Sequence, residues 1–61
     1  MKKFSVKAIR VNLGLTREEM AKELSISVRA YTDKENGKST WYWDEIFKIC
    51  EIAELSPEQI K

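Results

Sequence analysis

The segment Leu15–Gly37, LTREEMAKELSISVRAYTDKENG, decides how this chain folds. Thr16 and Glu19 form the pattern of a capping box, in which each side chain accepts a hydrogen bond from the backbone N–H of the other residue and a helix begins. Ser27 supplies the same kind of N-cap for a second helix. Because only the three residues Leu24–Ile26 separate the two helices, they must cross steeply instead of folding back on each other, which predicts a helix-turn-helix.

The flanking segments supply the helices against which this pair must pack, since helices this short are marginal alone. Apolar residues at helical spacing predict a helix over about Phe4–Asn12. The aromatic run Trp41–Trp43 opens another helix, and Ser56 followed by Pro57 predicts a short fifth one. We therefore expect an all-α fold, a compact five-helix bundle, in which residues 1–61 form a single domain.

The second helix of the pair divides its side chains between two faces. Arg10 lies in the apolar stripe of the first helix, where a cation needs a carboxylate partner, and Glu35 is the best candidate. The inward positions of the second helix are Ala30, Tyr31 and Lys34, and the outward positions are Val28, Arg29, Thr32, Asp33 and Asn36.

The aromatic run has two interpretations. In the first, Trp43 closes the core and Phe47 packs beside it. In the second, Trp41 or Tyr42 is exposed and meets a phosphate backbone or a partner protein.

Composition excludes most kinds of catalytic and metal site. The chain has no His and one Cys, which leaves no intrachain disulfide, His/Cys metal cluster, or Ser-His or Cys-His couple. We expect no enzymatic activity, no metal and no cofactor, and we interpret Cys50 as a small buried thiol. The sequence contains no apolar run long enough to span a bilayer and no signal-peptide pattern, so we expect a cytoplasmic protein with no membrane partner.

The formal net charge of +1 conceals an uneven distribution. Residues 1–38 carry nine Lys or Arg against five acids, a balance of +4, whereas residues 39–61 carry two against five, a balance of −3. The basic part contains the helix pair. This polarity suits a phosphate-facing side and a solvated back.

These residues resemble the phage repressor and Cro class of helix-turn-helix DNA-binding domains, over most of the chain. The positions that carry the resemblance are Arg10, Gly14-Leu15-Thr16, Glu19, Ala21, Leu24, Ile26-Ser27, Glu35-Asn36-Gly37-Lys38 and Leu55-Ser56. The resemblance implies a five-helix domain that binds double-stranded operator DNA as a two-fold dimer and represses transcription. The recognition helix would be about Ser27–Asn36, lying in the major groove.

The resemblance also implies roles for individual residues. Arg10 and Glu35 stand where the class has a structural ion pair. The implied phosphate contacts are Arg17, Asn36 and Lys38. The implied base contacts are Ser27, Val28, Arg29, Thr32 and Asp33.

Three positions depart from the pattern of the class. Arg17 replaces a glutamine, which keeps phosphate binding. Ser25 replaces a glycine in the turn, where a positive φ would cost roughly 1–2 kcal/mol. Lys34 stands where the class prefers a large apolar residue, so it must extend along Trp or Tyr, or the packing there differs.

Two further questions stay open. The chain could instead be a protein-interaction module, antitoxin-like or anti-repressor-like, that uses Trp41, Tyr42 and the C-terminal helices. Arg29 could clamp a guanine or pair with Asp33 on its own helix.

The dimer that the resemblance implies needs a contact between copies. We expect this seam at the apolar C-terminal residues, namely Leu55, Pro57 and Ile60.

Overall fold

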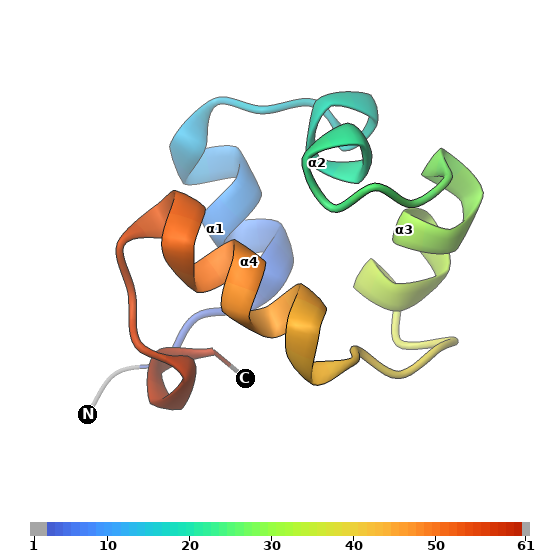
Figure 1. Cartoon of the computed structure of the whole chain (residues 1–61). Coiled ribbons are helices and arrows are strands. Elements are labelled where there is room, and N and C mark those ends of the chain that lie inside the picture. Colours follow the sequence, from blue (N-terminus) through green and yellow to red (C-terminus); the bar gives the residue numbers. More distant parts are fainter. Residues whose placement is uncertain (1–2, 61) are drawn as a thin grey trace.

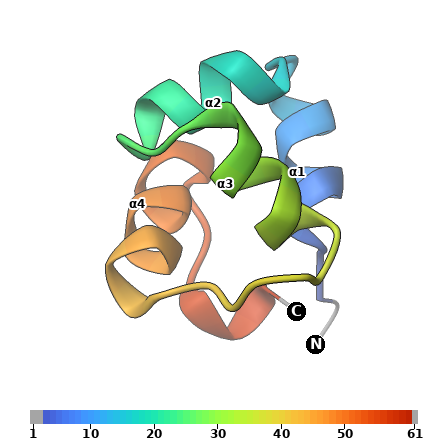
Figure 2. The ribbon, with the colours of Figure 1, turned by 90° about the vertical axis from the view of Figure 1, so that its right-hand side faces the viewer.

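Four α-helices and one 3-10 turn make up the computed structural model of the chain, which describes residues 3–60 (Figure 1). The elements are α1 (Val6–Leu13), α2 (Arg17–Glu23), α3 (Val28–Glu35), α4 (Trp43–Ala53) and η1 (Pro57–Gln59). Helices α1 and α4 lie side by side, and the α2–α3 pair covers one flank of them (Figures 1 and 2).

The prediction of a five-helix bundle is wrong at the C-terminus, where the expected fifth helix is the single 3-10 turn η1. Pro57 starts that turn, but Ile60 already has the extended backbone angles φ −99° and ψ 132°. Ile60 forms a parallel bridge with Phe4, and the Phe4 N–H donates to the carbonyl oxygen of Gln59 at 2.7 Å. After Gln59 the chain therefore pairs with the N-terminal segment instead of continuing as a helix.

The same bridge moves the start of the first helix. We expected that helix to begin at about Phe4, but Phe4 is held in the bridge, and α1 begins at Val6. Ser5 is its N-cap, because its hydroxyl oxygen accepts from the Ala8 N–H at 3.1 Å. Ile60 is also buried, so it is not available as part of the expected dimer seam.

Each of the four α-helices is followed by a residue with left-handed backbone angles. Two of these are glycines, Gly14 and Gly37, and two are not, Ser25 at φ 57° and Glu54 at φ 56°. After α2, the N–H groups of Ser25 and Ile26 donate back to Lys22 and Ala21, which is a Schellman motif. Ser25 thus holds the conformation that the turn requires, without the residue type that adopts it most easily.

The core forms where the four helices meet. Its largest fully buried side chains are Tyr31, Met20 and Ile49, contributed by α3, α2 and α4. Trp41 covers this core, with its ring in edge contact with Tyr31 at a centroid distance of 5.7 Å. The expectation that Trp43 closes the core is wrong: its side chain is 70% exposed, because α4 begins at Trp43 and turns it outward.

A buried ion pair joins the end of α3 to the start of α4. Lys34 Nζ donates to Glu45 Oε2, and both side chains are less than a tenth exposed. Lys34 extends along aromatic rings, as the sequence predicts, with Nζ 4.4 Å from the ring centroid of Tyr42. Its carboxylate partner, Glu45, was not predicted from the sequence. Glu45 Oε1 also accepts from the Tyr42 N–H at 2.9 Å, so one side chain caps α4 and neutralises Lys34.

Replacing Ser25 by Gly should stabilise the fold by about 1 kcal/mol, because the left-handed backbone no longer carries a Cβ. Urea denaturation measures the difference. Ser39→Gly is the matched control, since Ser39 is an exposed loop residue without a positive φ, and it should be neutral or slightly destabilising. Equal effects of the two substitutions would show that backbone strain at Ser25 is not the cause.

Glu45→Ala should destabilise the fold by about 3 kcal/mol or more, because it strands the buried Lys34 ammonium and removes the cap of α4. Adding Lys34→Met to that variant should recover part of the loss. Glu51→Ala, at a side chain that is 75% exposed, should change stability by no more than about 0.5 kcal/mol. A melting midpoint that Glu45→Ala leaves unchanged would contradict this account of the pair.

Candidate nucleic-acid interface

The outer face of α3 is the surface on which the sequence places base contacts. Ser27, Val28 and Arg29 are exposed at the start of the helix, and Thr32 and Asp33 are half-buried one turn later. Figure 2 shows the molecule from the side on which α3 lies, with α2 above it and α4 beside it. The structure brings these five candidates together on one helix.

Two hydroxyl groups of this face are engaged within the helix itself. The oxygen of Ser27 accepts from the Ala30 N–H at 3.1 Å and so caps α3. Thr32 donates from Oγ1 to the carbonyl oxygen of Val28 at 2.8 Å. Because its proton is committed, Thr32 presents outward an acceptor lone pair and a methyl group.

The Arg29 side chain is exposed and free to meet a ligand. Among residues 3–60, Arg29 takes part in no hydrogen bond or ion pair, and the alternative pairing with Asp33 four residues on is not formed. The guanidinium therefore keeps all of its donors available at the first turn of α3.

The three candidate phosphate contacts surround α3 at its C-terminal end and at the start of α2. Asn36 and Lys38 are exposed after the end of α3, where the Lys38 N–H donates to the Asp33 carbonyl oxygen at 2.8 Å and holds the loop. Arg17 begins α2, and its Nε donates to Glu35 Oε1 at 3.2 Å. Its side chain is 45% exposed, so its two terminal nitrogens remain accessible while Nε orients the group.

Glu35 is the centre of the network that holds this surface in place. Its side chain is 1% exposed. Oε2 accepts from Arg10 Nε at 2.9 Å and from the Tyr31 hydroxyl at 2.6 Å, while Oε1 accepts from Arg17. Arg10 also donates from a terminal nitrogen to the carbonyl oxygen of Leu15 at 2.8 Å. The network therefore joins α1, the start of α2 and the end of α3.

The sequence predicts the Arg10–Glu35 contact, but not the other two donors. Tyr31 lies four residues before Glu35 on the inward face, a spacing at which side chains meet on a helix. That spacing was the available signal for the tyrosine. Arg17 gave no comparable signal, because its reach to Glu35 depends on how α2 crosses α3.

The pKa values of this cluster follow from the contacts. Burial acts to raise the pKa of Glu35, but the hydrogen bonds from Tyr31, Arg10 and Arg17 together outweigh burial and lower it below 4.5. Burial raises the pKa of the Tyr31 hydroxyl, and the Glu35 carboxylate raises it further. The Glu35 hydrogen bond raises the pKa of Arg10. At neutral pH the cluster thus holds one carboxylate, two guanidinium groups and a neutral phenol.

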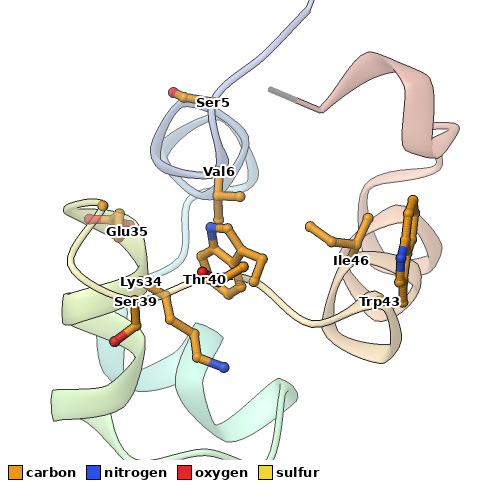
Figure 3. Close-up of a pocket in the computed structure, with 10 residues that line it drawn as sticks. Ser5, Val6, Lys34, Glu35, Ser39, Thr40, Trp43 and Ile46 are labelled. Atoms are coloured by element: carbon orange, nitrogen blue, oxygen red, sulfur yellow. The ribbon is translucent and has the colours of Figure 1, made fainter.

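An open cavity of about 570 Å³ lies between the start of α1, the loop after α3 and the start of α4 (Figure 3). Val6, Trp43 and Ile46 supply apolar surface, while Lys34 and Glu35 lie at one wall. Both charged groups are already paired, with Glu45 and with Arg10. The cavity therefore offers mainly apolar surface and no uncommitted charge from these two residues.

Neither a metal site nor a membrane span is found in the part of the chain that the structure describes. Residues 3–60 bring together no group of three His, Cys, Asp or Glu side chains that could hold a metal ion. No helix in that range is long and apolar enough to cross a bilayer. Cys50 is buried, as expected, and burial raises the pKa of its thiol.

Comparison with known proteins identifies the class of this helical unit. A family model described as Helix-turn-helix matches residues 6–41, from the start of α1 to the Trp41 that covers the core, more than half of the chain. The chain therefore belongs to the helix-turn-helix family of Cro and repressor type, a family of DNA-binding transcription regulators and not of enzymes. No curated protein and no solved structure matches the chain.

The free energy of unfolding should fall as the pH drops below about 4.5, and the Glu35 cluster should account for much of the fall. The folded pKa of Glu35 lies below its ordinary value of 4.5. Its contribution is therefore complete above that value and is lost as the pH falls through the folded pKa. Denaturation measured across the acid range should give a shallower pH dependence for Glu35→Gln than for the unaltered chain.

Two further variants make this test specific. Tyr31→Phe removes one bond that lowers the pKa of Glu35, so it should shift the acid loss of stability to higher pH. Glu51→Gln, at an exposed residue, should leave the profile unchanged. An acid profile that neither Glu35→Gln nor Tyr31→Phe alters would show that Glu35 is not the titrating group.

Proposed function

We propose that this chain is a sequence-specific repressor that binds operator DNA as a homodimer, with α3 in the major groove of each half-site. The observation that carries the proposal is the free guanidinium of Arg29 on an exposed helix start. The opposite face of that helix is fixed by Tyr31, Lys34 and Glu35. A recognition helix needs this combination of an inward face held rigidly and an outward face with unpaired hydrogen-bond donors.

Each outward residue of α3 has a role that suits its available chemistry. Arg29 can donate two hydrogen bonds to O6 and N7 of one guanine, and Val28 beside it can pack on a thymine methyl group. Thr32 offers an acceptor and a methyl group. Asp33 can accept from the exocyclic amine of cytosine, which is the base interaction that a carboxylate favours. Ser27 lies at the helix start, where its hydroxyl also caps α3.

Phosphate contacts would fix the orientation of α3 without reading sequence. Arg17 can bind a phosphate with its terminal nitrogens while Nε stays on Glu35. Asn36 and Lys38 can bind a phosphate on the other side of α3. These residues belong to the basic part of the chain, whose balance is +4 over residues 1–38.

The dimer follows from the size of the reading surface. One helix contacts only a few base pairs, so small domains of this class reach useful affinity through two half-sites about 34 Å apart. A two-fold protein then reads a palindromic site. In free solution we expect a monomer or a weak dimer.

Selection of bound duplexes from a random pool should yield a palindromic site, and variants can then be measured on it. Arg29→Ala should cost about 1–3 kcal/mol of binding free energy and relax the preference at one base position in each half-site. The reason is that the guanine loses its bidentate partner.

Lys38→Ala is the matched comparison, because it removes one positive charge from the same surface. It should weaken binding to all sequences alike and reduce the dependence on salt concentration. Uniform weakening by Arg29→Ala, with base preference intact, would make Arg29 a phosphate contact. Failure of the selection to enrich any sequence would overturn the proposed function.

A further inference from the structure

The exposed face of α4 carries an aromatic pair that lies outside the candidate base and phosphate contacts. Trp43 is 70% exposed and Phe47, one helical turn later, is 55% exposed. Their rings stack at a centroid distance of 5.7 Å and an angle of 30°. Large aromatic side chains held together in water usually mark a contact surface, because their exposure is unfavourable.

Charged side chains border this pair in a matching order. Asp44 and Lys48 each follow one of the aromatic residues, are exposed, and are also one helical turn apart. Among residues 3–60, Asp44 has no ion-pair partner, and Lys48 has only a loose contact with Glu51 at 3.9 Å. The face therefore has an aromatic and an acidic side chain at one end, Trp43 and Asp44. At the other end it has an aromatic and a basic side chain, Phe47 and Lys48.

Such a face is complementary to itself. Two copies of α4 can lie antiparallel across a two-fold axis that passes between the helices at the level midway between Trp43 and Lys48. Trp43 of each copy then faces Phe47 of the other. The same arrangement sets Asp44 of each copy against Lys48 of the other, so both the apolar and the charged groups find partners. Self-complementarity of this kind is what a two-fold interface requires.

We propose that the α4 face formed by Trp43, Asp44, Phe47 and Lys48 is the surface through which two copies of this chain form a dimer. This inference rests on the proposed function, which calls for a dimer, and it names α4 in place of the expected C-terminal seam, of which Ile60 is buried. The two aromatic side chains expose roughly 300 Å² in each copy. Two copies would bury about 600 Å² of aromatic surface, less than the roughly 1,200 Å² at which standard specific interfaces begin, which predicts a weak dimer that DNA stabilises.

The position of the face also suits coupling to DNA. The Lys34–Glu45 ion pair ties the start of α4 to the end of α3. Contact between two α4 helices therefore fixes the spacing of the two recognition helices, and a palindrome of the matching half-site spacing would be bound cooperatively.

Sedimentation equilibrium of the purified chain, up to millimolar concentration, tests the proposal directly. The unaltered chain should form dimers. Trp43→Ser and Phe47→Ser should each raise the dimer dissociation constant by about tenfold or more, since aromatic anchors dominate small interfaces. Val11→Ser is the matched control, because Val11 is an apolar side chain of α1 that is 60% exposed, and it should leave association unchanged.

A charge exchange identifies which residues meet. Asp44→Lys places two cations on the face and Lys48→Asp places two anions there, so each variant alone should associate poorly. Mixing the two variants should restore association, because the two cations of one chain then face the two anions of the other. Restoration on mixing is specific to contact between copies, whereas pairing within one helix would not produce it.

Two outcomes overturn the proposal. One is a chain that stays monomeric at millimolar concentration, which would assign the aromatic pair to another partner. The other is dimerisation that the α4 variants do not affect. Failure of the proposed function is distinguishable, because a chain that dimerises through α4 but enriches no duplex would retain this interface without DNA recognition.

Discussion

The side chain of Glu35 is the constraint on which the rest of the structure depends. Three donors from three segments converge on its two oxygens: Arg10, Arg17 and Tyr31. A domain of 61 residues buries a smaller fraction of its surface than a larger domain does, so packing alone holds its short helices only marginally. Convergent charge-assisted hydrogen bonds supply the missing geometry, because each bond is strong and has a preferred direction. The position of α3 is thus determined largely by polar chemistry at one buried carboxylate.

A second buried carboxylate, Glu45, has the complementary task. Glu35 locks α3 to α1 and α2, and Glu45 locks α3 to α4 through Lys34. Buried ion pairs are often no more stabilising than apolar residues of the same size, but they accept few alternative arrangements. Two such pairs at adjacent positions of one helix leave α3 little freedom to rotate. In the proposed function, recognition of base edges would depend on that orientation, since a small rotation would carry Arg29 away from the proposed guanine.

Local signals predicted the fold correctly, and so did the charge pattern that paired Arg10 with Glu35, but other contacts between distant residues were not predicted. The caps at Thr16 and Ser27 are formed as predicted, because each involves residues three positions apart. In the aromatic run, periodicity could not distinguish Trp41 from Trp43, since Trp41 precedes the helix and its direction is set by the loop. Ile60 was missed as a core residue because its partner, Phe4, lies at the other end of the chain. Membership of the helix-turn-helix family could be predicted from the sequence, because most of the residues that carry the resemblance lie in helix caps and turns.

The bridge between Phe4 and Ile60 has a consequence for building with this domain. It brings the two ends of the described chain together at one corner, which lies away from α3 (Figure 1). Adjacent termini make a fold suitable for circular permutation, in which a short linker joins the old ends and new ends open in a surface loop. They also mean that fluorescent or ligand-responsive modules grafted onto either end would project from the same corner, leaving the face of α3 unobstructed. Two modules of a split reporter, one on each end, would start within reach of each other.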